Sequence, residues 1–317
     1  MQAMAIERFG APEELNLLDL PEPRLPPDAL LIRTRAAALN PVDTKIRAGA
    51  LEGRFPCFFP LVPGWDVAGV VERAGPAVRG FAPGDEVVAY CRKDFIQEGT
   101  YAELVVVRAA QAAPKPGSLS FEEASGLPLA GLTAYQAIYD ALELQPGETM
   151  LVNRAAGGVG CLAVQLGRIV GARVIGVASA PNHELLRELG AAECIDYRET
   201  DPLEAVREAH PEGIDAVFDL LAGEALQRSG EVLRPGGRVV SILQPPDAAA
   251  FARREVSAFY VFVLPDGDQL RALTKLAEGG ELVVPVHRTM PLSEARAAQE
   301  LLEEGHVSGK LVLSVDG

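Results

Sequence analysis

The run AAGGVG at residues 155–160 has the glycine spacing of an anion-binding turn. An apolar segment at 150–152 predicts a buried strand before it, a helical apolar pattern follows it, and residues 173–178 predict a second strand. In this setting Gly157 lets the backbone approach a pyrophosphate, and Gly160 lets the helix pack against the strand. The residues expected to bind a dinucleotide here are Ala155, Gly157, Gly158, Val159 and Gly160. The alternative is an ordinary strand–helix–strand unit with a glycine-rich turn.

The chain beyond this run continues to alternate between strand and helix patterns. Strands are expected at residues 193–196, 214–221, 236–243 and 256–264, with helical patterns between them. Such alternation is typical of a doubly wound parallel sheet.

The first part of the chain has a different pattern, with short strands separated by glycine and proline. Strands are predicted at residues 2–7, 30–35, 67–73, 84–89 and 99–107. Many short strands of this kind indicate an all-β lobe, which we expect to be a barrel. The spacing becomes helical at Ser120, and the chain closes with two helices at 269–278 and 292–304 and a strand at 310–315.

Length and composition limit the classes of protein. The 317 residues are enough for about two domains, and 48% hydrophobic with 23% charged residues is usual for a soluble globular chain. A formal net charge of −15 argues against nucleic acid as a partner. No apolar run reaches the length of a membrane span, and no signal peptide is recognised. Four scattered cysteines fit a reducing cytosol, so a cytoplasmic location is expected.

Several motifs occur in an order that resembles a known family. The segments NPVDTKIRAG, GWDVAGVVE, GDEV, GTYAE, GLTAYQA, AAGGVG and GKLVLSV are similar to those of the medium-chain dehydrogenase/reductases. Within that superfamily the chain most resembles the zinc-less quinone oxidoreductase branch. The resemblance implies a GroES-like β-barrel catalytic domain at 1–127 and 265–317, with a Rossmann dinucleotide-binding domain at 128–264.

The resemblance also indicates whether the chain can bind a catalytic zinc ion. Zinc members of the family bind a catalytic ion through a Cys, the His of a GHE motif and a residue before the GLTA helix. The matching positions here are Asn40, Trp65 and Leu129, which provide neither a thiolate nor an imidazole. We therefore expect a metal-free enzyme. Without a Lewis acid, the expected reaction is hydride transfer to a quinone, an enone or a similar activated carbonyl compound.

The resemblance assigns further candidate residues, each with a structural alternative. Asn40 and Asp43 are expected to face the nicotinamide and the substrate, although Asp43 could instead cap a helix. Lys45 is a third catalytic candidate, with a solvated side chain as the alternative. Trp65 and Tyr90 are substrate-pocket candidates that could equally belong to the core.

Other candidates concern the cofactor. Thr133 resembles a family residue whose hydroxyl approaches the nicotinamide ribose, and a helix cap is the alternative. Leu243, at the end of a predicted strand, is included among the cofactor-binding residues. Phe262 and Val263 would offer backbone groups to the nicotinamide amide, and the alternative is a plain buried strand.

The type of nicotinamide cofactor is predicted from the residues after the second strand. An NAD site has an acid about 20 residues beyond the glycine turn, whereas Ala178-Ser179 stand there and Glu184 is the next acid along the chain. Arg154 is expected to pair with a 2′-phosphate, with a solvent-facing turn residue as the alternative, and Ser179 and Asn182 are expected to add neutral hydrogen bonds. These residues favour NADPH over NADH.

Three functional hypotheses remain at this point. The leading one is a reductase acting on a small-molecule electron acceptor. The second is a cofactor-binding sensor or structural protein with little turnover, and the third is an alcohol dehydrogenase-like enzyme, which the missing ligands disfavour. We also expect a homodimer formed through the strand at 256–264.

Overall fold

The computed structural model describes residues 1–315, whose contacts form two compact units. Unit 1 comprises Met1–Leu132, Pro265–Gly280 and the described residues from Val284 onward, and unit 2 comprises Thr133–Leu264 and Glu281–Val283. The division expected after residue 127 thus falls after residue 132, within one helix, and the division after residue 264 is the same. The boundaries of independently folding domains stay a prediction.

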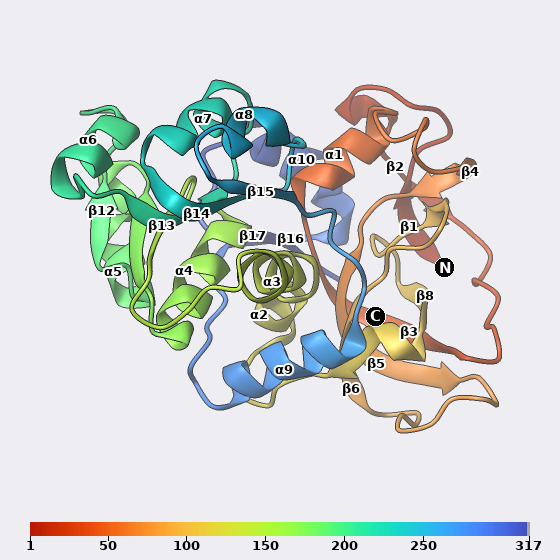
Figure 1. Ribbon diagram of the computed structural model, residues 1–317. Helices are drawn as coiled ribbons and strands as arrows, with labels where there is room; N and C mark the ends of the chain where they lie inside the picture. The colour runs from red at the N-terminus through yellow and green to blue at the C-terminus, as the bar shows by residue number, and fades with distance from the viewer. Residues whose placement is uncertain (316–317) are drawn as a thin grey trace. The chain divides into compact units, whose positions relative to one another are not determined.

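Unit 2 contains a parallel sheet, drawn in green to blue in Figure 1. Its strand order is β12-β11-β10-β13-β14-β15. The strands are β10 (Thr149–Val152), β11 (Arg173–Val177), β12 (Glu193–Ile195), β13 (Ile214–Asp219), β14 (Leu233–Ser241) and β15 (Ser257–Tyr260). The order reverses between β10 and β13, and ligands bind beyond the carboxyl ends of the strands at such a point. The predicted doubly wound sheet is confirmed.

The helices of unit 2 follow its strands in the chain. They are α4 (Gly158–Val170), α5 (His183–Leu189), α6 (Pro202–Ala209), α7 (Gly223–Arg228) and α8 (Ala248–Ala252). Gly171 ends α4 with a left-handed φ of 90°, as the sequence predicts for a helix stop. Apolar side chains of the sheet pack against these helices, with Leu151, Val217 and Val239 wholly buried.

Unit 1 is rich in β-strands, as expected. Its strands are β1 (Gln2–Ala5), β2 (Asn16–Asp19), β3 (Ala29–Ala38), β4 (Cys57–Val62), β5 (Asp66–Ala74), β6 (Glu86–Tyr90), β7 (Ile96–Glu98), β8 (Leu104–Arg108), β9 (Ala112–Pro114), β16 (Val286–Pro291) and β17 (Lys310–Ser314). The largest sheet has the order β16-β17-β3-β5-β6-β9, with β8 also on β3. The closing strand β17 therefore pairs with the early strand β3.

The helices of unit 1 are short, apart from two near the end of the chain. They are α1 (Pro41–Arg47), α2 (Phe121–Ser125), α9 (Gly267–Glu278) and α10 (Ala295–Glu304). The predicted cap of α2 is confirmed, because Ser120 accepts a hydrogen bond from the Glu123 N–H and the Glu123 carboxylate accepts one from the Ser120 N–H. In the described part of the chain, no helix has the length and the apolar character to cross a bilayer.

Several predicted elements differ from the structure at their ends. The strand expected at 99–107 is β8 alone, because Gly99, Thr100 and Tyr101 form a turn whose N–H groups bond to residues 62–64. The strand expected at 256–264 ends at Tyr260, since the backbone of Leu264 is held by the side chain of Gln136 instead of the sheet. The helix expected from residue 131 is α3 (Pro128–Tyr135) and begins earlier.

Candidate active site

The glycine turn of unit 2 lies between β10 and α4, where the sequence predicted it. A side chain at position 160 would place its Cβ 2.4 Å from the carbonyl oxygen of Arg154 and 2.6 Å from that of Ala155. A Cβ at position 157 would meet the Arg154 carbonyl oxygen at 3.4 Å, an ordinary contact. Packing therefore requires glycine at 160, whereas at 157, the residue directly before α4, the fold has room for a side chain.

Arg154 occupies a strained position in this turn. Its φ of 48° is left-handed, a backbone conformation that favours glycine over other residues. The side chain is exposed. A solvent-facing turn residue is thus what the structure describes, and pairing with a phosphate stays a prediction.

The segment after β11 lies beside an acid, Asp196, that comes directly after β12. The Asp196 carboxylate accepts the backbone N–H of Ala180 at 2.9 Å, and the Asn182 amide donates to the Ser179 hydroxyl at 3.1 Å. Hydrogen bonds from backbone N–H groups, that of Arg198 first, lower the pKa of Asp196. No acid stands between Ser179 and Glu184 in the sequence, but the inference that no negative charge lies near this segment is wrong, because the pairing of β12 with β11 brings Asp196 beside it.

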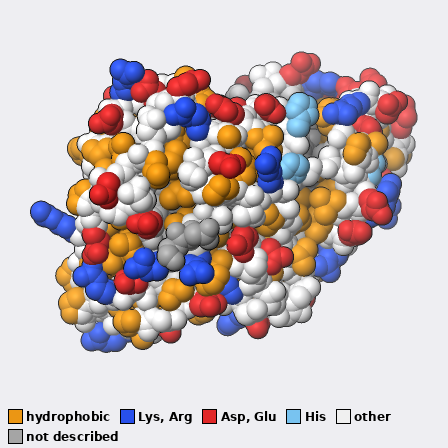
Figure 2. Space-filling view, turned by 180° about the vertical axis from the view of Figure 1, so that it is seen from behind, with side chains coloured by type: hydrophobic (Ala, Val, Ile, Leu, Met, Phe, Trp, Pro, Cys, Tyr) orange, Lys and Arg blue, Asp and Glu red, His pale blue; other side chains and the backbone are white. Residues whose placement is uncertain are grey.

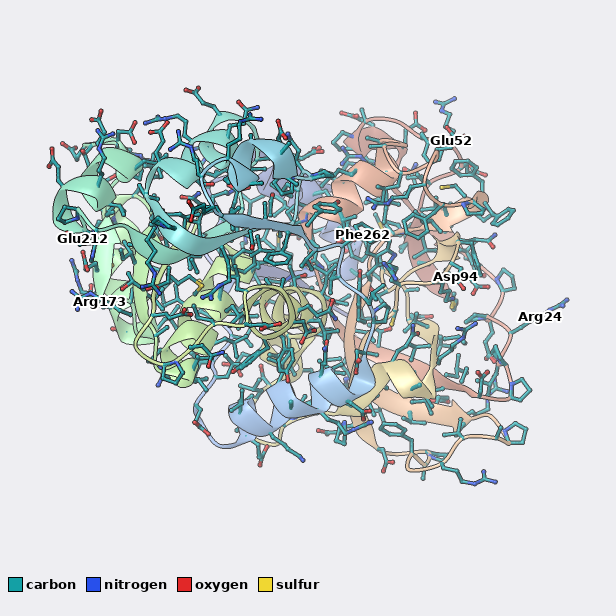
Figure 3. All side chains as sticks on the ribbon, in the orientation of Figure 1. Arg24, Glu52, Asp94, Arg173, Glu212 and Phe262 are labelled. Atoms are coloured by element: carbon teal, nitrogen blue, oxygen red, sulfur yellow. The ribbon has the colours of Figure 1, made fainter. Side chains whose placement is uncertain are left out.

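The other cofactor candidates of unit 2 occupy different environments. Thr133 is 3% exposed and lies inside α3, so it is not an N-terminal cap. Leu243 is 41% exposed beyond the end of β14. Val263 is buried, and Phe262, labelled in Figure 3, is half-buried in the segment after β15. Their contacts with a cofactor stay predictions.

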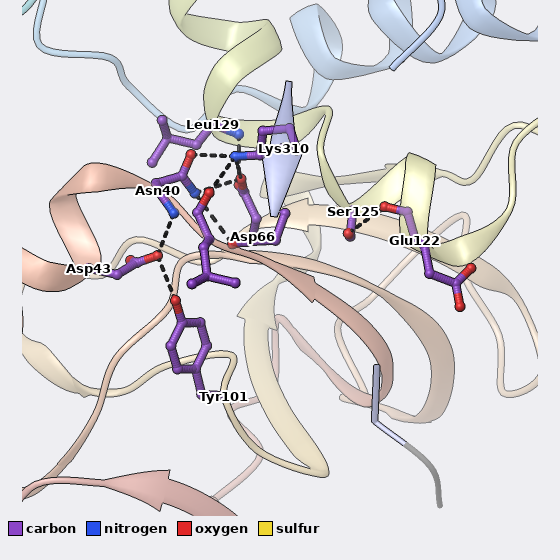
Figure 4. Close-up of polar contacts among 10 residues, drawn as sticks. Asn40, Asp43, Asp66, Tyr101, Glu122, Ser125, Leu129 and Lys310 are labelled. Atoms are coloured by element: carbon purple, nitrogen blue, oxygen red, sulfur yellow. Dashed lines mark hydrogen bonds and ion pairs between the residues drawn. The ribbon is translucent and has the colours of Figure 1, made fainter. Parts of the chain in front are cut away.

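In unit 1, Asn40 belongs to a buried polar cluster that Figure 4 shows. Its amide nitrogen donates to the Asp66 carboxylate at 2.8 Å, and its amide oxygen accepts from the Lys310 ammonium at 2.6 Å. The Leu129 backbone N–H donates to the other oxygen of Asp66 at 2.7 Å. Asn40 is 3% exposed, and both ends of its amide are hydrogen-bonded, so it links Asp66 to Lys310. Its contact with the nicotinamide and the substrate stays a prediction.

Asp43 is a second buried acid of this cluster. One of its oxygens accepts the Asn40 backbone N–H at 2.8 Å and the Tyr101 hydroxyl at 3.0 Å. Its other oxygen is buried and has no hydrogen-bond partner among the described residues. Burial, with the nearby charge of Asp66, raises the pKa of Asp43 to about 7. Asp43 caps a helix, as its structural alternative stated, because its carboxylate accepts the backbone N–H of Asn40 at the N-terminus of α1.

The remaining unit 1 candidates lie outside these hydrogen bonds. Lys45 is exposed on α1, as its alternative stated. Trp65 is 4% exposed, with its ring edge-on to Phe55 and to Tyr90, so it fills the core. The Tyr90 hydroxyl is buried and has no hydrogen-bond partner within residues 1–315, and burial raises its pKa.

Sequence reasoning missed Asp66, Tyr101 and Lys310. A signal was present for two of them, because Asp66 follows Trp65 in the motif GWDVAGVVE and Lys310 opens the apolar run of GKLVLSV. A lysine at the first position of a buried strand needs an internal partner. Tyr101 lies in a turn and gave no such signal.

Comparisons with known proteins match both units. Residues 26–117 match the family model of the alcohol dehydrogenase GroES-like domain, and residues 189–313 match that of zinc-binding dehydrogenase. The NADPH-dependent alkenal/one oxidoreductase of Arabidopsis thaliana, described as chloroplastic, is 34% identical over 99% of this chain and 79% of its own length. The chain belongs to the medium-chain dehydrogenase/reductase superfamily. The structure of the quinone oxidoreductase from Coxiella burnetii is also similar, with a TM-score of 0.90 and 36% sequence identity. The match covers 100% of this chain and 99% of the Coxiella burnetii chain.

A third relative is longer than this chain. The synaptic vesicle membrane protein VAT-1 homolog of Homo sapiens is 37% identical over 76% of the chain, which covers 60% of that protein's length. Together the matches place the chain in the quinone oxidoreductase branch of the superfamily and confirm its GroES-like and Rossmann folds.

The described residues contain no group of three or more His, Cys, Asp or Glu side chains arranged to hold a metal ion. One matching family model is named for zinc. The three positions that resemble zinc-ligand positions of the family carry the amide of Asn40, the indole of Trp65 and the aliphatic side chain of Leu129. The absence of a catalytic metal stays a prediction.

Proposed function

We propose that this chain is a reductase that transfers hydride from NADPH to a quinone or an enone. The oxidoreductase class and the nicotinamide cofactor follow from the family. The observation that carries the proposal is the glycine turn, because it combines an open backbone at Gly157 with the N-terminus of α4 at the switch point of the sheet. These features fit the pyrophosphate of a dinucleotide.

In this proposal, residues of the chain bind the cofactor and hold it in place. The N–H groups at the start of α4 bind the pyrophosphate, and Gly160 holds that helix against the turn. When bound, the cofactor supplies hydride to the β-carbon of the acceptor. The electron pair then moves to the acceptor's oxygen, and a proton from water completes the product. Delocalisation of the resulting anion removes the need for a metal ion.

NADPH is proposed over NADH because an arginine, Arg154, lies in the glycine turn and because one relative's name specifies NADPH. Asp196 opposes this preference, since its charge is close to the segment that would receive a 2′-phosphate. We propose a cytoplasmic location, since the four cysteines are free thiols. We also propose no nucleic-acid partner, since the net charge is −15 and acidic and basic side chains are interspersed on the face in Figure 2.

A steady-state screen of quinones and enones with each reduced cofactor tests the proposal. Consumption of NADPH that depends on the acceptor and exceeds that of NADH is expected. Tight cofactor binding without turnover on any acceptor would instead support the sensor hypothesis. Elemental analysis of untagged protein is expected to find no stoichiometric zinc, and one zinc per chain that is needed for activity would contradict the metal-free reaction.

A further inference from the structure

Lys310 is a buried cation with three acceptors around it. Its side chain is 4% exposed at the first position of β17. The ammonium donates to the Leu39 carbonyl oxygen at 2.8 Å and to the Asn40 amide oxygen at 2.6 Å, and it lies 3.5 Å from the Asp66 carboxylate. An ammonium has three N–H donors, so this environment fits the charged form of lysine.

Two partners of Lys310, Asn40 and Asp66, are hydrogen-bonded to each other as well as contacting the lysine. Because Lys310 requires an oxygen and Asp66 requires a donor, the Asn40 amide has a single satisfactory orientation. Asp66 also accepts the Leu129 N–H, so it connects the start of α1 with the first turn of α3. Removing the ammonium would leave the Asp66 charge uncompensated and the Asn40 oxygen without its donor.

Charge balance in the cluster depends on this one lysine. Burial raises the pKa of Asp66 and lowers that of Lys310, and the attraction between them opposes both changes. The charge of Asp66 also acts on four other titratable groups, Asp43, Tyr90, Cys91 and Tyr101, and raises the pKa of each. The pKa of Tyr90, Cys91 and Tyr101 is raised by burial, so these groups stay neutral and provide no compensating charge.

Two of the three positions that match zinc ligands in the family converge on this cluster. Asn40 reaches Asp66 through its side chain, and Leu129 reaches it through its backbone N–H. We infer that Lys310 is a positioning residue of the proposed reaction, a fixed internal cation that holds Asn40, Asp66 and the start of α3 in one arrangement without a metal ion. This inference rests on the proposed function.

The test compares Lys310→Met, Asp66→Asn and the double variant Lys310→Met/Asp66→Asn with the wild-type enzyme. The double variant removes both charges and avoids an unpaired buried carboxylate, so it is expected to fold even where Lys310→Met does not. Lys275→Met on α9 is the matched control, because this lysine is exposed. Folding is checked by circular dichroism before kinetics are measured.

We expect kcat with an enone to fall at least about tenfold in Lys310→Met and by a similar factor in the double variant, as for other orienting contacts. The KM for NADPH is expected to stay within about twofold, since the cofactor turn is in unit 2. In Lys310→Met the acid limb of the kcat profile should move to higher pH, because Asp66 without its cation binds a proton more readily. Adding Asp66→Asn should abolish that movement.

Three results would overturn the inference while the wild type is active. The first is a double variant that folds and has the kcat of the wild type. The second is a double variant whose fold-loss in kcat equals the product of the fold-losses in the two single variants. The third is an acid limb of the kcat profile that stays at the same pH in Lys310→Met as in the wild type. A wild-type enzyme with no turnover that depends on the acceptor would overturn the proposed function instead, and the two failures are thereby distinguished.

Discussion

Asp43 is a buried acid whose ionisation contributes to the pH dependence of stability in unit 1. Burial raises its pKa from 3.8 to about 7 in the folded state. Between these values the folded chain retains a proton that the unfolded chain releases. The free energy of unfolding therefore falls as the pH rises from about 4 to about 7, by up to roughly 4 kcal/mol.

Asp43→Asn should remove that dependence. The amide oxygen can still accept from the Asn40 N–H and the Tyr101 hydroxyl, and it carries no charge at any pH. Urea unfolding at about pH 5 and about pH 8 should show a smaller loss of stability in the variant than in the wild type. Asp28→Asn, at an exposed position, is the control. Equal losses in variant and wild type would show that Asp43 is ionised throughout.

Arg154→Ala tests the proposed choice of cofactor. If the guanidinium pairs with the 2′-phosphate, the variant should raise the KM for NADPH about tenfold or more, as expected for a charge-assisted contact of about 1.5–3 kcal/mol. The KM for NADH should hardly change. Equal weakening of both cofactors, or a wild type that prefers NADH, would show that Arg154 is a solvent-facing turn residue only.

Local residues of the site were predictable from the sequence, and distant ones were not. The roles of Gly157 and Gly160 follow from a few consecutive positions, because a turn and the first turn of a helix are local structures. The Asn40–Lys310 bond joins residues 270 positions apart, and the pairing of β3 with β17 creates it. Asp196 likewise approaches Ala180 because β11 and β12 are neighbours.

At the scale of elements, the turn between β10 and α4 combines a structural and a binding requirement. Gly160→Ala should destabilise the fold, because its Cβ would approach two backbone oxygens at 2.4 and 2.6 Å. Gly157→Ala should leave the melting temperature within about 2 °C of the wild type and still weaken NADPH binding, since its methyl group would enter the space facing the helix N-terminus.

Calorimetry and cofactor titration of these two variants provide the check. Gly147→Ala is not a suitable control, because its φ of 82° is itself left-handed. Gly53→Ala is suitable, because nothing lies within 4 Å of a Cβ there and its φ is not positive. Unchanged NADPH affinity in Gly157→Ala would contradict the assigned binding mode.

Strand boundaries were less predictable than strand identities. The apolar run at 256–264 reads as one long strand, yet β15 ends at Tyr260 because Gln136 takes over the backbone of Leu264. A side-chain amide can replace two ladder hydrogen bonds, and no periodicity in the run reveals it. β8 is shorter than expected for a different reason, because the backbone N–H groups of residues 99–101 bond to residues 62–64 in a turn.

At the scale of the whole molecule, we propose a homodimer formed through β15. This strand is the last in the order of its sheet, and Phe259 on it is 37% exposed. An unpaired edge of this kind favours pairing with a second copy. Light scattering at micromolar concentration should give the dimer mass, and Phe259→Arg should shift it toward the monomer. Phe58→Arg, at an exposed site in unit 1, should not, and a wild-type monomer would contradict the proposal.

The class of fold was predictable because it depends on repetition along the whole chain. Alternating strands and helices from 149 to 260 identify a parallel sheet, and short strands between glycines and prolines identify the β-rich unit. The return of the C-terminal segment to the first domain came from the family resemblance. Its pairing with β3 was not predicted, since nothing in the composition of 310–315 indicates its partner strand.

Transfer of a labelled hydride tests the central claim most directly. NADPH carrying deuterium on the reactive carbon of its nicotinamide ring is supplied with an enone, and the reduced product is analysed by mass spectrometry. The proposed function predicts one deuterium per product molecule, located at the former β-carbon, when the deuterium occupies the diastereotopic position from which the enzyme transfers hydride. A product without deuterium from either labelled position, or no reduced product at all, would contradict it.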